Sequence, residues 1–310
     1  MGLSPLAGSA VDGWYWGMTT NRRLGVGLIV LAGLIAGYVV LGPLVLGVIR
    51  FRTSGSGLNQ IRGGDLAALF VVAPVCALIG RLAWRGHRRA PVLALAPALF
   101  AMYTYSQLVL GNEYLDRPGN VERAFPLLLA MFLLASVIAV HCWGAADRDQ
   151  LPSLTRRLER GSGILLLVLA AFLVVGLHLP TLLPALRDPP TGAAYLDAPT
   201  AFWVVKFYDL GIVAPAAVAV GLGLLRGRSW AQKAAYGVLG GFVLLGWSVA
   251  GMAWVMWVSA DPDASAVMVT AFTGIGLAGS TFAYFLYGPL FRSPEPGSDD
   301  GDESGGRDRG

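Results

Sequence analysis

The chain has 310 residues, of which 55% are hydrophobic and only 14% carry a charge. Ordinary soluble domains have roughly a quarter of charged residues, so this composition excludes a typical soluble globular protein. The net charge of +4 comes from arginines clustered between apolar runs, without a basic stripe, and this excludes a nucleic-acid-binding surface.

The first 23 residues hold aromatic side chains from Trp14 to Trp16, followed by Arg22 and Arg23. A secretory signal peptide places its charge first and follows it with a short apolar core. Here the apolar run 24–49 comes after the arginines, and it is too long for such a core. We therefore expect 1–23 to be a cytoplasmic N-terminal segment that leads into an uncleaved first transmembrane helix.

Eight apolar segments follow one another, each long enough to cross a bilayer core of roughly 30 Å. In lipid, an α-helix satisfies its own backbone hydrogen bonds, and continuous apolar runs argue against a β-barrel. The sequence therefore predicts an all-α, polytopic membrane helix bundle with eight transmembrane helices. Their expected bounds are 24–49, 65–84, 91–111, 124–143, 162–186, 202–225, 234–258 and 265–290.

The arginines and lysines of the connections indicate the orientation, because cytoplasmic loops carry an excess of them. Sixteen lie in the set of segments that includes both termini, and six lie in the other set. This predicts a multi-pass protein of the bacterial cytoplasmic membrane with both termini in the cytoplasm. The first set is the N-terminus, 81–90, 144–161, 226–233 and the C-terminus; the second is 50–64, 112–123, 187–201 and 259–264.

The last stretch, 292–310, is rich in acidic residues and glycine and short of apolar ones. Such a composition is typical of a disordered segment, here an acidic cytoplasmic tail. The two cysteines, Cys76 and Cys142, have no second cysteine nearby, so we expect neither a disulfide nor a cysteine metal site.

A pattern, Val-Ala-Pro-x5-Gly-x4-Arg-Gly, occurs twice, at 72–86 and 213–227, with an aspartate upstream of each copy. It suggests two parallel four-helix halves, 24–143 and 162–291, joined by the basic cytoplasmic linker 144–161. Spans 3 and 4 show no clear match to spans 7 and 8, and a chance match in chains so rich in Ala, Val, Gly and Leu is the alternative.

The prolines of the two copies, Pro74 and Pro215, stand at equivalent depths and predict helix kinks. Such kinks either line a cavity or pack against a neighbouring helix, and both interpretations stay open. The GxxxG pair Gly33 and Gly37 predicts a close helix-packing surface, as does the pair Gly237 and Gly241.

Lys206 and Asp209 stand three residues apart near the start of the sixth apolar run, so they share a helix face. Ionisable residues within a span suggest a functional polar site. In the alternative, Asp209 caps the helix at the outer interface while Lys206 reaches into the headgroups, and Asp65 caps the second span in the same way.

Other polar residues are expected on the same outer face, and we predict that they form one outward-facing, ligand-binding pocket. There is no motif for a catalytic site, a cofactor or a metal, and the three histidines are too scattered for haem ligation. We therefore predict no catalytic residue, no metal and no cofactor. The six predicted ligand-binding residues are Asp65, Glu113, Arg123, His178, Lys206 and Asp209.

Three stretches carry a resemblance: RGGDLAALFVVAP, GNEYLDRPGNVERAFPLL, and FWVVKFYDLGIVAP with the later GLLRGRSWAQKAAYG. In them the chain resembles uncharacterised multi-pass membrane proteins of actinobacteria, over most of 24–291. The resemblance implies a helical membrane architecture and no catalytic residues.

Three functions remain open from the sequence. The first is binding or transport of a small molecule through the outward-facing polar site. The second is a membrane-embedded sensor, scaffold or assembly partner of another membrane protein. The third is a lipid- or envelope-modifying enzyme with acid and base residues among Glu113, His178 and Asp209. In each case membrane lipids are partners and nucleic acids are not.

Overall fold

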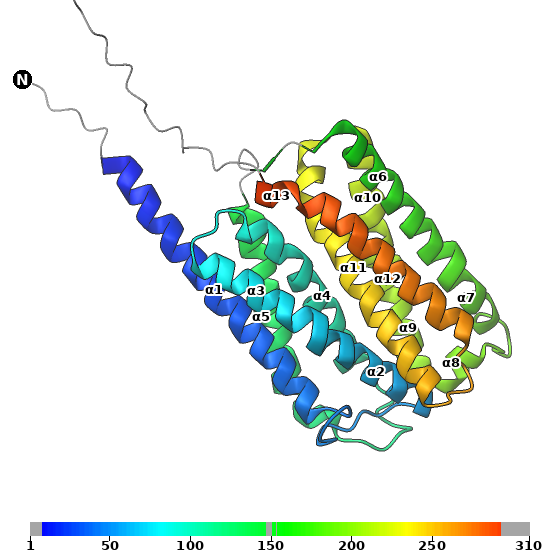
Figure 1. Cartoon of the computed structure of the whole chain (residues 1–310). Helices are drawn as coiled ribbons and strands as arrows, with labels where there is room; N and C mark the ends of the chain where they lie inside the picture. The colour runs from blue at the N-terminus through cyan, green and yellow to red at the C-terminus, as the bar shows by residue number, and fades with distance from the viewer. Residues whose placement is uncertain (1–7, 147–150, 153, 293–310) are drawn as a thin grey trace, which may run out of the picture.

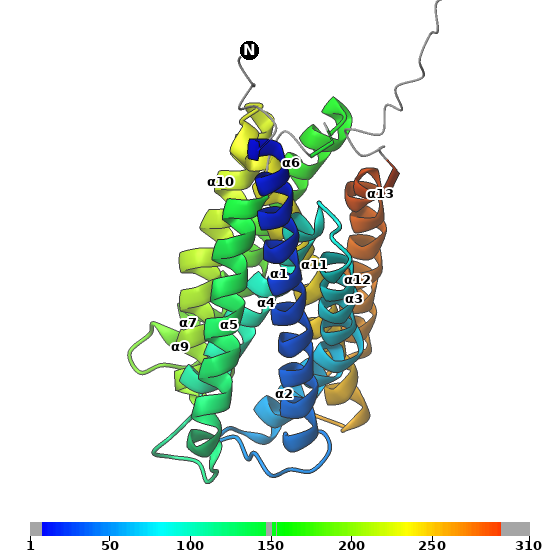
Figure 2. The ribbon, with the colours of Figure 1, turned by 90° about the vertical axis from the view of Figure 1, so that its left-hand side faces the viewer.

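A computed structural model describes the backbone of residues 8–146, 151–152 and 154–292, and the side chains of 21–146, 151–152 and 154–291. Within these ranges the chain forms helices and no strand. The helices lie side by side along one long axis (Figures 1 and 2). The predicted disordered tail lies outside the described residues, apart from Arg292.

Eight helices in the described ranges are long and apolar enough to cross a membrane, which confirms the predicted all-α polytopic bundle. Many large apolar side chains on the outside of the bundle are exposed, among them Phe70, Val140 and Phe207, as expected for a surface in contact with lipid. The spans are Asn21–Leu41, Gly55–Trp84, Ala90–Leu110, Val121–Ala145, Arg156–Ala185, Pro199–Leu225, Ser229–Val258 and Ala266–Phe291.

Several spans contain more than one helical element. The first four consist of α1 (Gly8–Leu41); α2 (Gly55–Ala67), η1 (Ala68–Val72) and α3 (Ala73–Trp84); α4 (Ala90–Leu110); and η2 (Val121–Ala124) with α5 (Phe125–Ala145). The last four consist of α6 (Arg156–Ala171), η3 (Phe172–His178) and α7 (Leu179–Ala185); α9 (Pro199–Tyr208), η4 (Asp209–Val213) and α10 (Ala214–Leu225); α11 (Ser229–Val258); and α12 (Ala266–Tyr287) with α13 (Pro289–Arg292). The short α8 (Ala193–Asp197) lies between the fifth and sixth spans.

Two predicted boundaries are wrong by about two helical turns or more. The first span ends at Leu41 and not at 49, because Gly42 and Pro43 follow it and proline cannot continue a helix. The second span begins at Gly55 and not at 65, because the Ser54 side chain accepts a 3.0 Å hydrogen bond from the Gly57 N–H and caps the helix there.

The elements η1, η3 and η4 are π-helical, and each ends two residues before a proline: Pro74, Pro180 and Pro215 respectively. At each π-segment the backbone N–H after it reaches the carbonyl five residues back, as from Ala73 to Ala68 and from Ala214 to Asp209. Proline lacks an N–H and its ring crowds the carbonyl four residues back, so a wider turn ahead of it relieves both defects.

The glycine inside each Val-Ala-Pro copy lies where two helices cross. A Cβ on Gly80 would lie 3.0 Å from the Gly25 carbonyl oxygen of α1, and a Cβ on Gly221 would lie 2.9 Å from the Gly163 carbonyl oxygen of α6. Only glycine permits such a close approach of two backbones. The first and second spans therefore cross as the fifth and sixth do.

The last glycine of each copy ends its helix. Gly86 and Gly227 have φ angles of +82° and +63°, a left-handed conformation that favours glycine. The residue after each one donates its N–H to a carbonyl five residues back, from His87 to Leu82 and from Arg228 to Gly223. The proline and both glycines of the pattern thus have a structural role, and these roles recur 141 residues apart.

The prediction of a close-packed surface at Gly33 and Gly37 is wrong, because a Cβ on either would meet no atom within 4 Å. The helices α2 and α11 approach each other closely instead at Gly63 and Gly251, where a Cβ on Gly63 would overlap the Gly251 carbonyl oxygen. Neither residue belongs to a GxxxG pair that the sequence singled out.

The N-terminal end of α1 and the short α13 lie at the same end of the bundle (Figure 1). At the opposite end, the loop after α1 is tied to the loop after α4. Arg52 binds both carboxylate oxygens of Glu122, at 2.6 and 3.1 Å, and its carbonyl accepts from the Glu113 N–H at 2.8 Å. The hydrogen bond to Glu122 raises the pKa of Arg52 above its ordinary value, so this link stays charged.

Candidate functional site

Lys206 and Asp209 lie well inside the sixth span. Because α9 begins at Pro199, Asp209 stands ten residues into the helix, about 15 Å along its axis. Both side chains are buried, with 6% of their surface exposed. The alternative in which Asp209 caps the helix and Lys206 reaches into the headgroups is therefore wrong.

Asp209 contacts His178 across the interface between the fifth and sixth spans. His178 is the last residue of η3 and Asp209 the first of η4, so both belong to π-helical segments. The His178 Nε2 atom lies 2.8 Å from Asp209 Oδ2, and His178 is only 4% exposed. π-Segments within α-helices occur frequently at functional sites, and here two of them hold the paired side chains.

Lys206 completes this contact from the other side of the imidazole. Its Nζ atom lies 3.3 Å from His178 Nδ1 and 2.8 Å from Thr181 Oγ1. With Lys206 charged, its ammonium group only donates, so Nδ1 accepts and a neutral His178 carries its proton on Nε2, from which it donates to Asp209. The three residues form a chain of hydrogen bonds with one positive and one negative charge at its ends.

Tyr103 of α4 satisfies the second carboxylate oxygen, since its hydroxyl donates to Asp209 Oδ1 at 2.7 Å. The Lys206 ammonium lies over the Phe202 ring, 4.0 Å from its centroid, which gives the cation a further favourable contact. We call Tyr103, His178, Thr181, Lys206 and Asp209 the Asp209 cluster. It joins the third, fifth and sixth spans.

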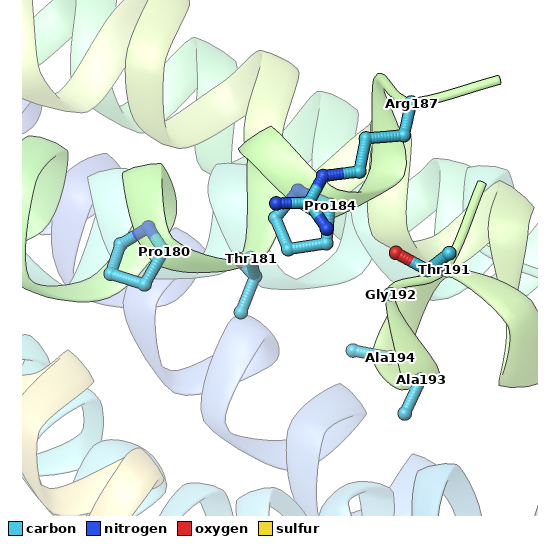
Figure 3. Close-up of a pocket in the computed structure, with 8 residues that line it drawn as sticks. All are labelled: Pro180, Thr181, Pro184, Arg187, Thr191, Gly192, Ala193 and Ala194. Atoms are coloured by element: carbon cyan, nitrogen blue, oxygen red, sulfur yellow. The ribbon is translucent and has the colours of Figure 1, made fainter.

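A hollow of about 400 Å³ reaches the cluster at Thr181. Figure 3 shows that its lining residues come from α7, α8 and the segment between them. Arg187 is the one charged residue among them, and Thr181 and Thr191 supply hydroxyl groups. The hollow lies at the end of the bundle opposite α13 and the N-terminal end of α1. It reaches from there to Thr181, whose hydroxyl accepts a hydrogen bond from Lys206.

Glu113 is buried but stands apart from this cluster. Its carboxylate accepts from the Thr200 N–H at 2.8 Å, from the Thr200 hydroxyl at 2.6 Å and from the Ala201 N–H at 3.3 Å. These are the free donors at the first turn of α9, so Glu113 caps the helix that carries Lys206. Arg123 lies on the outside of the bundle with an exposed side chain.

Asp65 belongs to a second polar group. It stands ten residues into the second span, counted from Gly55, and is 3% exposed, so it does not cap that helix either. Its neighbours are Tyr38 of α1 and Tyr105 of α4, both fully buried. The structure therefore brings together three of the six predicted ligand-binding residues: His178, Lys206 and Asp209.

Tyr103, Thr181 and Tyr38 belong to these clusters and were not predicted from the sequence. One signal was present for Thr181, which follows His178 by three residues and so lies on the same helix face. A tyrosine within an apolar helix gives no such signal, because most such residues simply pack. In the part of the chain that the structure describes, no three His, Cys, Asp or Glu side chains gather to hold a metal ion.

Comparison of the chain with models of protein families, with curated proteins and with solved structures gives no match. We therefore infer the function from the geometry of the Asp209 cluster and the hollow beside it.

Proposed function

We propose that the protein binds a small organic anion, such as a carboxylate, at the Asp209 cluster and carries it across the membrane. The observation that supports this is a lysine buried within the sixth span, next to a hollow whose one charged lining residue is Arg187. Buried ionisable residues of spans typically lie on substrate or ion pathways.

The hollow favours an anion over a cation or an apolar molecule. Arg187, its one charged lining residue, attracts negative charge, and the hydroxyl of Thr191 also lines it. No carboxylate lines it, so an entering anion meets no repulsion of like charge before it reaches Thr181.

Binding exchanges the partners of Lys206. In the empty cluster the ammonium donates to Thr181 and to His178, both uncharged acceptors. A carboxylate that enters past Thr181 offers the ammonium an acceptor of opposite charge, which adds a Coulombic attraction that the two uncharged acceptors lack. Asp209 keeps its bonds to His178 and Tyr103 throughout.

This exchange couples the anion to a proton. The empty cluster is neutral, with one ammonium and one carboxylate, so a second carboxylate leaves it with one negative charge. A buried net charge is costly. The Nδ1 atom of His178 is released when Lys206 turns to the anion, and it is the base that takes up the compensating proton.

The proposed orientation places both termini in the cytoplasm of a bacterium and the hollow on the outer face. The end of the bundle that holds α13 and the N-terminal end of α1 also holds the arginine-rich connections 85–89 and 226–228. An excess of arginine is typical of the cytoplasmic side.

We also propose that the two Val-Ala-Pro copies belong to two related four-helix halves. Three features at a common spacing of 141 residues support this: η1 and η4, the crossing glycines Gly80 and Gly221, and the left-handed Gly86 and Gly227. A parallel repeat places equivalent segments at the same membrane depth.

A binding experiment on purified protein in detergent tests the proposed anion site. We expect at least one of lactate, succinate, benzoate and glutamate, each at millimolar concentration, to raise the melting temperature of the wild type. The rise should disappear in Lys206→Gln and in Arg187→Gln, and persist in Lys233→Gln, which changes the chain's other lysine. If none of these anions stabilises the wild type, or if Lys206→Gln responds like the wild type, the proposal is wrong.

An uptake experiment tests the coupling to protons. Proteoliposomes with a pH dye inside receive the anion identified by binding, and the lumen should acidify as it enters. Replacing His178 by Gln should uncouple or abolish this acidification. Uptake without any change of lumenal pH would contradict the role of His178.

A further inference from the structure

Asp65 is buried in the second span without a partner of opposite charge among the described side chains. Arg62, one turn earlier on α2, donates its Nε–H to the Pro43 carbonyl at 3.3 Å and makes no ion pair with Asp65. An isolated ionised carboxylate in a low-dielectric interior is strongly disfavoured, so something must compensate its charge.

Three oxygens in this group have no hydrogen-bond partner in the described part of the chain. They are Asp65 Oδ2 and the hydroxyl oxygens of Tyr38 and Tyr105. The two tyrosine rings pack edge to face with centroids 5.5 Å apart, and the Tyr38 hydroxyl faces Asp65 without a hydrogen bond of good geometry. Buried polar atoms rarely go unpaired, and three in one place point to a missing ligand.

The end of α1 adds a fourth oxygen. The carbonyl of Val39 would bond to the N–H four residues later, but that residue is Pro43, which has none. A single point beside Gly42, where a Cβ would stand, lies 3.4 Å from the Val39 carbonyl oxygen, 3.4 Å from Asp65 Oδ2 and 3.1 Å from the Tyr38 carbonyl oxygen. The broken helix end therefore turns its acceptors toward the carboxylate.

We propose that this group, which we call the Asp65 cluster, binds a monovalent metal cation such as sodium. Its ligands are Asp65 Oδ2, the Val39 carbonyl and the hydroxyls of Tyr38 and Tyr105. The carbonyl ends of interrupted helices are a recurrent source of ligands for coupling ions in membrane proteins.

The chemistry of the ligands selects this class of ion. They are all oxygens and include one carboxylate, which matches one positive charge and leaves a divalent ion uncompensated. The four proposed ligands include no nitrogen or sulfur atom of the kind that transition metals prefer. A proton on Asp65 would also neutralise the charge, and the infrared measurement below distinguishes that state from a bound cation.

The Asp209 cluster shows how a similar buried aspartate is compensated when a positive side chain is nearby. It too combines a buried aspartate ten residues into its span with a tyrosine of α4, and there Lys206 supplies the positive charge. The Asp65 cluster has no such side chain, and a cation from solution takes that place. The proposed cation site does not depend on the proposed anion, because the cation compensates the charge of Asp65 alone.

Binding of radioactive sodium to the purified protein, in choline chloride and without any organic anion, tests this inference. We expect saturable binding of one ion that excess unlabelled sodium displaces. It should be lost in Asp65→Asn, which keeps the shape of the side chain, and in Gly42→Ala, whose Cβ would stand among the ligands without changing the charge. Asp116→Asn, the matched control at an exposed aspartate outside both clusters, should bind as the wild type does.

A second measurement keeps the outcome independent of folding. Sodium chloride should raise the melting temperature of the wild type above its value in choline chloride of equal strength, and the difference should vanish in Tyr105→Phe. Absence of saturable sodium binding by the wild type, or equal binding by Asp65→Asn, overturns the inference. So does an infrared band of a protonated carboxyl that Asp65→Asn removes and sodium leaves unchanged.

Discussion

The charges of Lys206 and Asp209 are buried together, and each offsets part of the free-energy cost of burying the other. They do not touch directly: His178 lies between them and transmits the interaction through its two ring nitrogens. Removing one partner of a buried pair leaves the other charge uncompensated, whereas removing both leaves an uncharged space. The pair therefore contributes little net stability, but the loss of one partner alone should be much more costly than the loss of both.

This predicts strong non-additivity at the residue scale. Asp209→Ala should destabilise the protein by about 3–5 kcal/mol, because it strands the Lys206 ammonium in the interior. The double variant Lys206→Ala with Asp209→Ala should lose less than the sum of the two single losses. Unfolding in detergent with increasing denaturant measures all four proteins of the cycle, and additive losses would show that the cluster does not act as a unit.

Glu113 has a different role, and its replacement should act on the helix that carries Lys206. Glu113→Ala should cost about 1–3 kcal/mol of stability, because it leaves the partly buried N–H donors of Thr200 and Ala201 without an acceptor. The control Arg123→Ala removes an exposed charge and should change stability by less than about 0.5 kcal/mol. Equal melting temperatures of the two variants would argue against the cap.

Part of the candidate site could be predicted from the residues. A spacing of three residues, which puts Lys206 and Asp209 on one helix face, suggested this pair, and an ionisable His178 within an apolar span was a natural addition. Which helix faces meet depends on the crossing geometry of the whole bundle, so neither Tyr103 nor the separation of Asp65 from Asp209 could be foreseen. Arg123 failed as a candidate because a position near a helix start does not reveal which way the side chain points.

At the scale of elements, the Val-Ala-Pro pattern describes how one helix is built. The proline follows a π-segment, the first glycine permits a close crossing, and the second glycine ends the helix in a left-handed conformation. Hydropathy located every span but misplaced the end of the first span and the start of the second. It does not register Pro43 inside an apolar run, nor a polar first turn that Ser54 caps.

The crossing glycines give a prediction with an internal control. Gly80→Leu and Gly221→Leu should each disrupt folding, because the new side chain would overlap the backbone of α1 or α6. Gly33→Leu adds the same volume on an exposed face with no atom within 4 Å and should be tolerated. Yield and monodispersity in detergent compare the three. If Gly80→Leu and Gly33→Leu behave alike, the crossing is not as close as the structure has it.

For the whole molecule, the first four spans and the last four differ in how closely their helices surround one another. α1 packs against both α3 and α5, so the first four helices surround one another. In the second half α6 packs against α10, while α12 packs chiefly against α11 and exposes apolar residues such as Val267 and Phe285. The proposed anion site is centred on the fifth and sixth spans, and the proposed cation site on the first and second. Two similar helix pairs would thus bind ions of opposite charge.

The orientation of this bundle decides which solution the hollow faces, and cysteine labelling can determine it. Leu115, 97% exposed in the loop after α4, lies at the end that holds the hollow, and Arg228 is exposed at the other end. The native Cys76 and Cys142 are buried and should give little background. In intact cells a membrane-impermeant maleimide should label Leu115→Cys at once and Arg228→Cys only after lysis. The reverse order would place the hollow in the cytoplasm, and labelling of both from outside would contradict the arrangement of the helices itself.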